Sequence, residues 1–268
     1  MKVVLFCGGA GMRLRGYSED VPKPMVTIGS RPVLWHVMKY YAHYGHKDFI
    51  LCLGYKGSVI KDYFLDYEES VSNDFVLTKG GRELEFMQRD IDDWRITFVD
   101  TGQRSTIGDR LRLVEPYLQG DETFLANYSD GLTDFPLPSL IEEFSRRDGY
   151  VSFLSVQPRS SSLDTVQTAE NGSVTAINSM KDSNVWVNGG YFVLRKDVFR
   201  YLKPEEEFVY EPMQRMIKES RVWSRRYEGF WQCMDTFKDK QVLDELESSG
   251  AAPWCVWKNG GHKTGAAS

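Results

Sequence analysis

Glycines and cations near the amino terminus form the pattern with the clearest chemistry in this chain. Directly after an apolar stretch, a Gly-Gly-x-Gly run is followed by two basic residues, and the set consists of Gly8, Gly9, Gly11, Arg13 and Lys23. A strand that ends in a glycine-rich turn exposes backbone N–H groups to which an anion can bind. The two cations can converge on the same anion. The spacing therefore predicts a phosphate-binding site, with a nucleoside triphosphate as the expected ligand.

The same glycines allow a second interpretation, because Gly-Gly-x-Gly is also a common tight turn in which glycine adopts positive φ. Two other phosphate-binding schemes do not fit the spacing. A P-loop requires G-x-x-x-x-G-K-[ST], and the sequence contains no such run. A dinucleotide-binding fingerprint requires G-x-G-x-x-G, but Leu14 stands where its third glycine should be. A redox protein with a Rossmann fold is therefore disfavoured.

Two aspartates are candidate metal ligands. Asp130 follows an apolar, strand-like segment and precedes Gly131, and Asp235 precedes a helical segment. A carboxylate at the carboxyl end of a strand commonly holds a Mg²⁺ ion that also contacts substrate phosphates. Each residue has a structural interpretation as well, because Asp-Gly is typical of turns and Asp235 could cap the helix that follows it.

These groups together suit nucleotidyl transfer, in which a phosphate oxygen attacks the α-phosphorus of a nucleoside triphosphate and pyrophosphate leaves. The charge that grows on the phosphate oxygens needs a metal ion and basic side chains rather than a covalent nucleophile. The attacking phosphate is already ionised at neutral pH, so no strong general base is required. The lack of an evident Ser/His/Asp or Cys/His set agrees with this chemistry.

Apolar periodicity predicts the elements that must position these residues. Strand and helix alternate in the first half of the chain, which predicts an α/β fold with a mostly parallel sheet whose ligand lies at the carboxyl ends of the strands. A small antiparallel insertion is expected within residues 68–104, where Gly80 and Gly81 suit a hairpin. Strands are expected at residues 2–7, 48–53, 75–77, 83–87, 95–99, 123–127, 151–156 and 191–194, and helices at residues 32–44, 58–67, 138–147, 205–218 and 238–248.

Composition limits the class of protein and its partners. The chain has 268 residues, of which 41% are hydrophobic, and suits one α/β domain. Its formal net charge of −5 gives no electrostatic reason to expect nucleic acid or an anionic membrane as a partner. Its apolar runs are too short to span a bilayer. The four cysteines, Cys7, Cys52, Cys233 and Cys255, show no C-x-x-C spacing, which favours free thiols and a cytoplasmic location.

Beyond these local patterns, the chain resembles the sugar-1-phosphate nucleotidylyltransferases and, within them, the cytidylyltransferases. The amino-terminal match is the glycine run through Arg13 and Leu14, followed by the Pro-Lys-Pro segment that contains Lys23. The match continues in one order to about residue 257, through PVLWH at 32–36, GYKG at 54–57, VDTG at 99–102, GDRL at 108–111, YSDG at 128–131, NGGYF at 188–192, GFWQCMDT at 229–236 and APW at 252–254.

The resemblance implies a Rossmann-like, three-layer nucleotidyltransferase fold and assigns roles to individual residues. The loop glycines and Arg13 would cradle the triphosphate, Lys23 would stabilise the α-phosphate, and Asp130 and Asp235 would hold Mg²⁺. The residues expected beside the nucleotide are Gly8, Gly9, Gly11, Arg13, Lys23, Thr101, Gly102 and Arg110, and the expected catalytic residues are Arg13, Lys23, Asp130 and Asp235. The resemblance also implies CTP as the nucleotide and a homo-oligomeric assembly.

Two departures from the family fall on the side of the site that would bind the acceptor. The family usually carries Glu-Lys-Pro before its Asn-Gly-Gly segment, whereas this chain has Ser179 and Met180 at the first two positions. Lys181 is one place further along, where a strand would face it the other way. Arg159 is followed by serines instead of the family's aromatic-glycine pair. The expected acceptor-binding residues are Arg159, Ser179, Lys181, Asn188, Gly189 and Trp231.

We therefore expect Mg²⁺-dependent transfer from CTP or another nucleoside triphosphate to a sugar 1-phosphate or a related phosphorylated acceptor. The alternative from a different class is a non-catalytic nucleotide-binding or regulatory homologue. The intact Lys23, Asp130 and Asp235 argue against it, because a pure binder has no need of the full metal set. One domain is expected over residues 1–258, with the nucleotide part at 1–135, the acceptor part at 136–258, and a flexible tail at 259–268.

Overall fold

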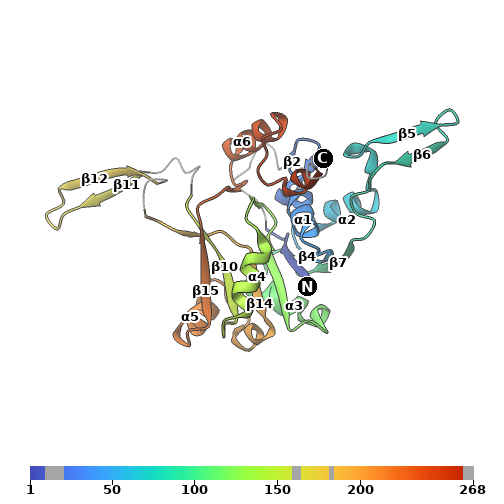
Figure 1. Cartoon of the computed structure of the whole chain (residues 1–268). Coiled ribbons are helices and arrows are strands. Elements are labelled where there is room, and N and C mark those ends of the chain that lie inside the picture. The colour runs from blue at the N-terminus through green and yellow to red at the C-terminus, as the bar shows by residue number, and fades with distance from the viewer. Residues whose placement is uncertain (10–20, 159–163, 181–183, 262–268) are drawn as a thin grey trace, which may run out of the picture.

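The computed structural model describes residues 1–9, 21–158, 164–180 and 184–261 of the chain (Figure 1). Its centre is an eight-stranded sheet in the order β13-β10-β14-β8-β1-β4-β7, with β15 also paired to β10. These strands are β1 (Val3–Phe6), β4 (Asp48–Leu53), β7 (Arg95–Asp100), β8 (Thr123–Tyr128), β10 (Val151–Val156), β13 (Val187–Asn188), β14 (Phe192–Arg195) and β15 (Val222–Tyr227).

Four neighbouring strands of this sheet run in the same direction. β1 pairs in parallel with β4 and with β8, and β4 pairs in parallel with β7. The other half is mixed, because β14 is antiparallel to both β8 and β10 whereas β15 is parallel to β10. The predicted α/β fold with a mixed, mostly parallel sheet is confirmed. The carboxyl ends of β1, β4, β7 and β8 meet at one edge.

Helices cover both faces of the sheet and create two cores, which gives three layers. Along β1, Val3 and Leu5 belong to one core and Val4 and Phe6 to the other, as the alternation of a fully buried strand requires. The first core includes side chains of α1 (Val33–His43), α2 (Gly57–Leu65), α4 (Leu137–Ser145) and α6 (Phe237–Ser248). The second includes those of α3 (Ile107–Val114) and α5 (Glu211–Lys218).

Two hairpins leave the body at opposite ends of the molecule (Figure 1). One is β5 (Phe75–Thr78) with β6 (Glu83–Phe86), which confirms the antiparallel insertion predicted around Gly80 and Gly81. The other is β11 (Asp164–Thr168) with β12 (Val174–Ser179), which the sequence patterns did not predict because its residues are mostly polar. Two further short antiparallel pairs are β2 (Thr27–Ile28) with β3 (Arg31–Pro32), and β9 (Gly131–Thr133) with β16 (Trp231–Cys233).

Other boundaries also differ from the prediction. Helix α5 begins at Glu211 rather than at 205, with Pro212 in its first turn, where the missing N–H of proline costs nothing. Short 3-10 helices are formed by Lys23–Met25, Glu69–Val71, Glu115–Leu118, Lys196–Tyr201 and Val256–Gly261. The last of these includes residues 259–261 of the predicted tail, and the remaining tail residues, 262–268, lie outside the described residues. In the described part of the chain, no helix is both long and apolar enough to cross a membrane.

Candidate active site

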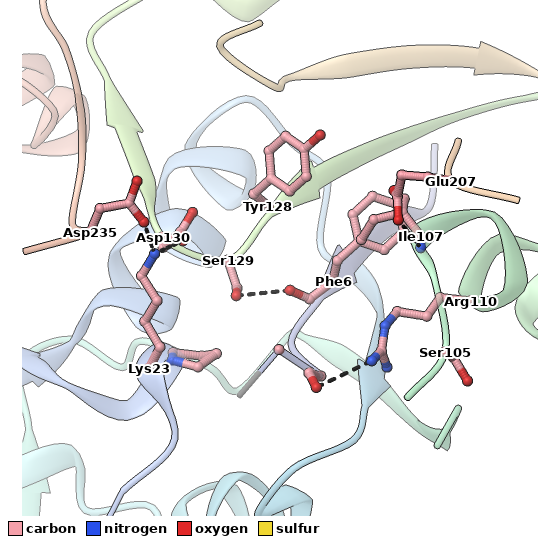
Figure 2. Close-up of a pocket in the computed structure, with 13 residues that line it drawn as sticks. Phe6, Lys23, Ser105, Ile107, Arg110, Tyr128, Ser129, Asp130, Glu207 and Asp235 are labelled. Carbon is pink, nitrogen blue, oxygen red and sulfur yellow. Dashed lines mark hydrogen bonds and ion pairs between the residues drawn. The ribbon is translucent and has the colours of Figure 1, made fainter. Parts of the chain in front are cut away.

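The shared carboxyl edge of the parallel strands opens onto a cavity of about 480 Å³ (Figure 2). Its lining combines the glycine turn after β1, the 3-10 helix that contains Lys23, the turn after β8 and the start of helix α3. The lining residues are Phe6, Gly8, Gly9, Lys23, Pro24, Ser105, Ile107, Arg110, Tyr128, Ser129, Asp130, Glu207 and Asp235. The cavity therefore lies where the sheet topology predicted a ligand.

Lys23 joins the two candidate metal ligands at one end of this cavity. Its ammonium group forms ion pairs with Oδ2 of Asp130 and Oδ1 of Asp235 (Figure 2). Burial lowers the pKa of Lys23, but the two carboxylates outweigh this effect and leave the pKa above its ordinary value. The lysine is therefore charged at neutral pH. Three residues that the sequence placed in one catalytic set are in direct contact.

Pairing between β9 and β16 brings the two aspartates together. Gly131, which follows Asp130, lies opposite Cys233, and the N–H of Met234 donates to the carbonyl oxygen of Asp130 at 3.0 Å. Helix α6 is capped by Thr236, whose side chain forms a reciprocal capping box with Asp239. The structural interpretation of Asp235 as the helix cap is therefore wrong, and its carboxylate faces Lys23 instead.

Arg110 holds together the ends of three parallel strands. Its guanidinium is buried and donates to Leu53 O at 3.2 Å, to Thr101 Oγ1 at 2.6 Å and to Gly8 O at 3.2 Å. A Cβ added at Gly8 would lie 1.9 Å from Nη1 of Arg110, so a side chain at this position would displace the guanidinium. Burial lowers the pKa of Arg110. Helix α3, which carries Arg110, was not among the helices predicted.

Two residues predicted beside the nucleotide directly follow strand β7. Thr101 is buried, and its hydroxyl donates to Leu53 O at 2.7 Å while accepting from Arg110. Gly102 has φ +87° and donates its N–H to Asp100 Oδ1 at 3.0 Å. Neither residue is part of the cavity lining, and their place beside a nucleotide stays a prediction. Thr101 helps to position Arg110, and the Arg110 side chain lines the cavity.

Part of the predicted acceptor set lies next to this cavity. Trp231 donates its indole N–H to Gly189 O at 2.9 Å, and the side-chain amide of Asn188 donates to the hydroxyl of Tyr128 at 3.3 Å. Tyr128 itself lines the cavity. Asn188, Gly189 and Trp231 thus lie near the carboxyl end of β8, from β13, the residue that follows it, and β16.

The remaining predicted residues are Ser179 and four residues outside the described part of the chain. Ser179 ends β12, pairs with Asp164 and belongs to the projecting hairpin rather than to the cavity lining. Gly11, Arg13, Arg159 and Lys181 lie outside the described residues. Their roles stay predictions.

Sequence reasoning missed several residues that line the cavity, of which Glu207 is the most informative. Its carboxylate accepts from the N–H of Ile107 at 3.3 Å. Burial raises the pKa of Glu207, although Arg110 and two backbone N–H groups oppose the shift. In the sequence, Glu207 ends a run of three glutamates, which is typical of a solvated surface, and no pattern distinguishes it from its neighbours.

The donor set at Lys23 fits a magnesium ion. Two carboxylates from different turns converge on a single cation, so their oxygens can also face a metal ion. Within the described ranges, no group of three or more His, Cys, Asp and Glu side chains could hold a metal. Mg²⁺ needs no such group when substrate phosphates and water complete its coordination, because one or two carboxylates then suffice.

Comparison with known proteins agrees with this geometry. The model of the family described as nucleotidyl transferase matches residues 2–236. The chain belongs to the nucleotidyl transferase family. The relation that the motifs predicted is thereby confirmed, and the protein is an enzyme that transfers a nucleotidyl group.

Relatives and solved structures resemble the chain over nearly its whole length. The glucose-1-phosphate cytidylyltransferases of Salmonella typhi and Salmonella typhimurium are each 36% identical over 262 residues, which cover 96% of this chain and 100% of theirs. The crystal structure of HddC from Yersinia pseudotuberculosis complexed with GMP-PN has a TM-score of 0.64 at 19% identity and covers 92% of this chain and 99% of that one. The inositol-1-phosphate CTP transferase from T. maritima has a TM-score of 0.61 at 16% identity, over 92% of this chain and 96% of that one. The solved structures support the fold alone.

Proposed function

We propose that this enzyme transfers the cytidylyl group of CTP to a sugar 1-phosphate or a related phosphorylated acceptor and releases pyrophosphate. The observation that carries the proposal is the contact of Lys23 with both Asp130 and Asp235 in a cavity beside Gly8 and Gly9. This arrangement offers backbone N–H groups and an ammonium for phosphates and two carboxylates for a metal ion. The two Salmonella relatives are named for cytidylyl transfer to glucose 1-phosphate.

Magnesium is the proposed cofactor, with Asp130 and Asp235 as its protein ligands. When bound, the ion would neutralise charge on the phosphates that react. The ammonium of Lys23, which contacts both carboxylates, would then be released to bind a phosphate oxygen. Lys23 would bind the α-phosphate and stabilise the charge that develops as pyrophosphate leaves.

The acceptor is proposed to differ from the one that the family usually takes. The family's acceptor-binding Glu and Lys are replaced by Ser179 and Met180, whereas the nucleotide end of the site keeps its residues. Losing a charged hydrogen bond to the acceptor phosphate would cost about 1.5–3 kcal/mol, so another group must replace it. Arg159 and Lys181 are the candidates. Trp231, Gly189 and Asn188, which lie together beside Tyr128, would form the other wall of the acceptor site.

Pyrophosphate release is the direct test. The purified protein is assayed with Mg²⁺, each of the four ribonucleoside triphosphates, and glucose 1-phosphate alongside other phosphorylated acceptors. Release that is fastest with CTP and stops when the metal is chelated supports the proposal. Rapid turnover of glucose 1-phosphate would exclude the altered acceptor. Mg²⁺-dependent CTP binding without release for any acceptor would favour the regulatory alternative.

We also propose that copies of this chain associate through hairpin β5–β6. The register places Phe75 opposite Phe86 and Leu77 opposite Leu84, so these four side chains share one face. Leu77 is 57% and Leu84 52% exposed. An isolated two-stranded hairpin is only marginally stable in water, so we propose that a second copy of the chain covers this face.

The four cysteines are free thiols, which supports the expected cytoplasmic location.

A further inference from the structure

The two ends of the active-site cavity differ in chemistry (Figure 2). Lys23, Asp130 and Asp235 lie at one end, and Ser105, Ile107, Arg110 and Glu207 lie at the other. A nucleotide is an extended ligand with its phosphates at one end. If the proposed function is correct and the phosphates bind at Lys23, the nucleoside must extend toward Glu207.

Glu207 has a different electrostatic setting from the two aspartates. Asp130 and Asp235 share the ammonium of Lys23 and would share the proposed metal ion. No cation in the described residues lies within ion-pair distance of Glu207, although Arg110 lies near enough to act on it electrostatically. A carboxylate in this position would repel phosphate oxygens. It would instead accept a hydrogen bond from a neutral N–H or O–H group of the ligand.

A backbone hydrogen bond orients the Glu207 carboxylate. Its Oε2 accepts from the backbone N–H of Ile107 at the start of helix α3. Glu207 also lines the cavity, so a carboxylate with up to four acceptor sites retains capacity for a ligand. The Arg110 guanidinium beside it is held by backbone and hydroxyl oxygens of three strand ends. Together they place a fixed acceptor next to a fixed donor.

We propose that Glu207 determines nucleotide specificity by accepting a hydrogen bond from the exocyclic 4-amino group of cytosine. Glutamate and aspartate are the side chains suited to accept from this amine. Uracil carries a carbonyl oxygen at the same position, whose lone pairs would face those of the carboxylate. The pairing therefore selects CTP over UTP. This inference rests on the proposed function, because it concerns the nucleotide that the same cavity would bind.

The test compares CTP with 2-pyrimidinone riboside triphosphate, which differs from CTP only in lacking the 4-amino group. Affinities are measured by calorimetry with Mg²⁺ and without acceptor, for wild type, Glu207→Ala, Glu207→Gln and the exposed control Glu205→Gln. Wild type and the control should prefer CTP by roughly 10- to 100-fold, the discrimination expected of one good pairing. Glu207→Ala should bind both equally. Glu207→Gln, which keeps an acceptor oxygen, should restore part of the preference.

Several outcomes would overturn the assignment and distinguish it from the proposed function. An unchanged preference in Glu207→Ala excludes base recognition by this residue while leaving cytidylyl transfer intact. A lost preference for CTP over 2′-deoxy-CTP, with the amine preference unchanged, assigns Glu207 to the ribose instead. A wild-type protein that binds UTP as tightly as CTP overturns both proposals. If Glu207→Ala does not fold, Glu207→Leu, which fills the space of the side chain without an acceptor oxygen, supplies the same comparison.

Discussion

The guanidinium of Arg110 donates to the carbonyl oxygen of Gly8 over 3.2 Å and thereby fixes the end of strand β1 from helix α3. The same side chain reaches the last residue of β4 and the residue that follows β7. One buried cation thus sets the relative positions of three strand ends that border the cavity. The glycine turn depends on this contact, because its first glycine leaves the space that the guanidinium fills.

Replacing Arg110 by lysine should disturb the cavity even though the charge is retained. A lysine ammonium cannot reproduce the planar fork that contacts three acceptors at once. We expect the free energy of unfolding to fall by about 1–3 kcal/mol, because at least one buried carbonyl loses its donor. Nucleotide affinity should fall with it. Urea denaturation and calorimetry measure the two effects, and Arg112→Lys, at an exposed arginine of the same helix, is the matched control. Equal losses of stability and of nucleotide affinity in the two variants would contradict the role of Arg110 in holding the three strand ends together.

Gly54 should tolerate no side chain. A Cβ there would lie 2.7 Å from Gly8 O and 2.8 Å from Gly102 O, and both neighbours are backbone atoms that cannot rotate away. Gly54→Ala should therefore separate the strand ends, lower stability by about 1–3 kcal/mol and weaken nucleotide binding. Gly9→Ala is the comparison for stability, because a Cβ at Gly9 meets no atom of the described residues within 4 Å. Thermal unfolding of both variants decides whether the backbone contact is the cause.

Lys23→Met should separate catalysis from metal binding. The lysine contacts both carboxylates, so its removal takes away a cation that competes with a metal ion for Asp130 and Asp235. Without this competition the two carboxylates attract a divalent ion more strongly. We expect metal affinity to hold or rise while nucleotidyl transfer falls by roughly 10²–10³-fold, the loss typical of removing a group that stabilises developing charge. Mn²⁺ titration by electron paramagnetic resonance measures the first effect. Weaker metal binding in the variant would exclude competition between the ammonium and the ion.

Local patterns were sufficient to predict the parts of the fold that repeat a regular period. The fully apolar strand at the amino terminus, the first helix and the hairpin around Gly80 all appear in the structure. The grouping of Lys23, Asp130 and Asp235 in one catalytic set came from the family resemblance, and the structure places the lysine in contact with both carboxylates. The regular elements depend on short sequence segments, whereas the catalytic set depends on motifs that match those of a family.

Other features could not be predicted because their cause lies far away in the chain. Asp235, which the sequence also allowed as the cap of helix α6, instead contacts Lys23 from the amino-terminal part of the chain, and Thr236 is the cap. The role of Thr101 depends on Arg110, which reaches it only after helix α3 has packed against the sheet. Glu207 enters the cavity from the chain segment before α5, and no local pattern marks its position. Side-chain direction at a tertiary contact is not encoded in the spacing of nearby residues.

A charge on the apolar face of hairpin β5–β6 should weaken association between copies of the chain. Leu84→Glu places a carboxylate among Phe75, Leu77 and Phe86. Thr78→Glu adds the same charge to the opposite face of the same hairpin and is the matched control. Light scattering after size-exclusion chromatography should show a smaller assembly for Leu84→Glu alone. The same mass for wild type and both variants would show that this face is not an interface.

Acid should destabilise the enzyme through His36, a histidine buried in helix α1. Trp254 donates its indole N–H to Nδ1 at 3.2 Å, so Nε2 carries the proton and donates to Ile28 O at 3.1 Å. Burial lowers the pKa of His36 from 6.5 to about 4 in the folded protein. Between pH 6.5 and about pH 4, the unfolded chain therefore binds a proton at this histidine that the folded chain does not bind. The contribution of this residue to the free energy of unfolding is complete above pH 6.5 and is lost as the pH falls toward 4, by up to roughly 3 kcal/mol.

Urea midpoints measured across this pH range should fall less steeply for His36→Gln than for wild type, because glutamine does not titrate. The control is His43→Gln, at an exposed histidine of the same helix, which should behave like wild type. Parallel curves for wild type and His36→Gln would show that another group controls the acid transition.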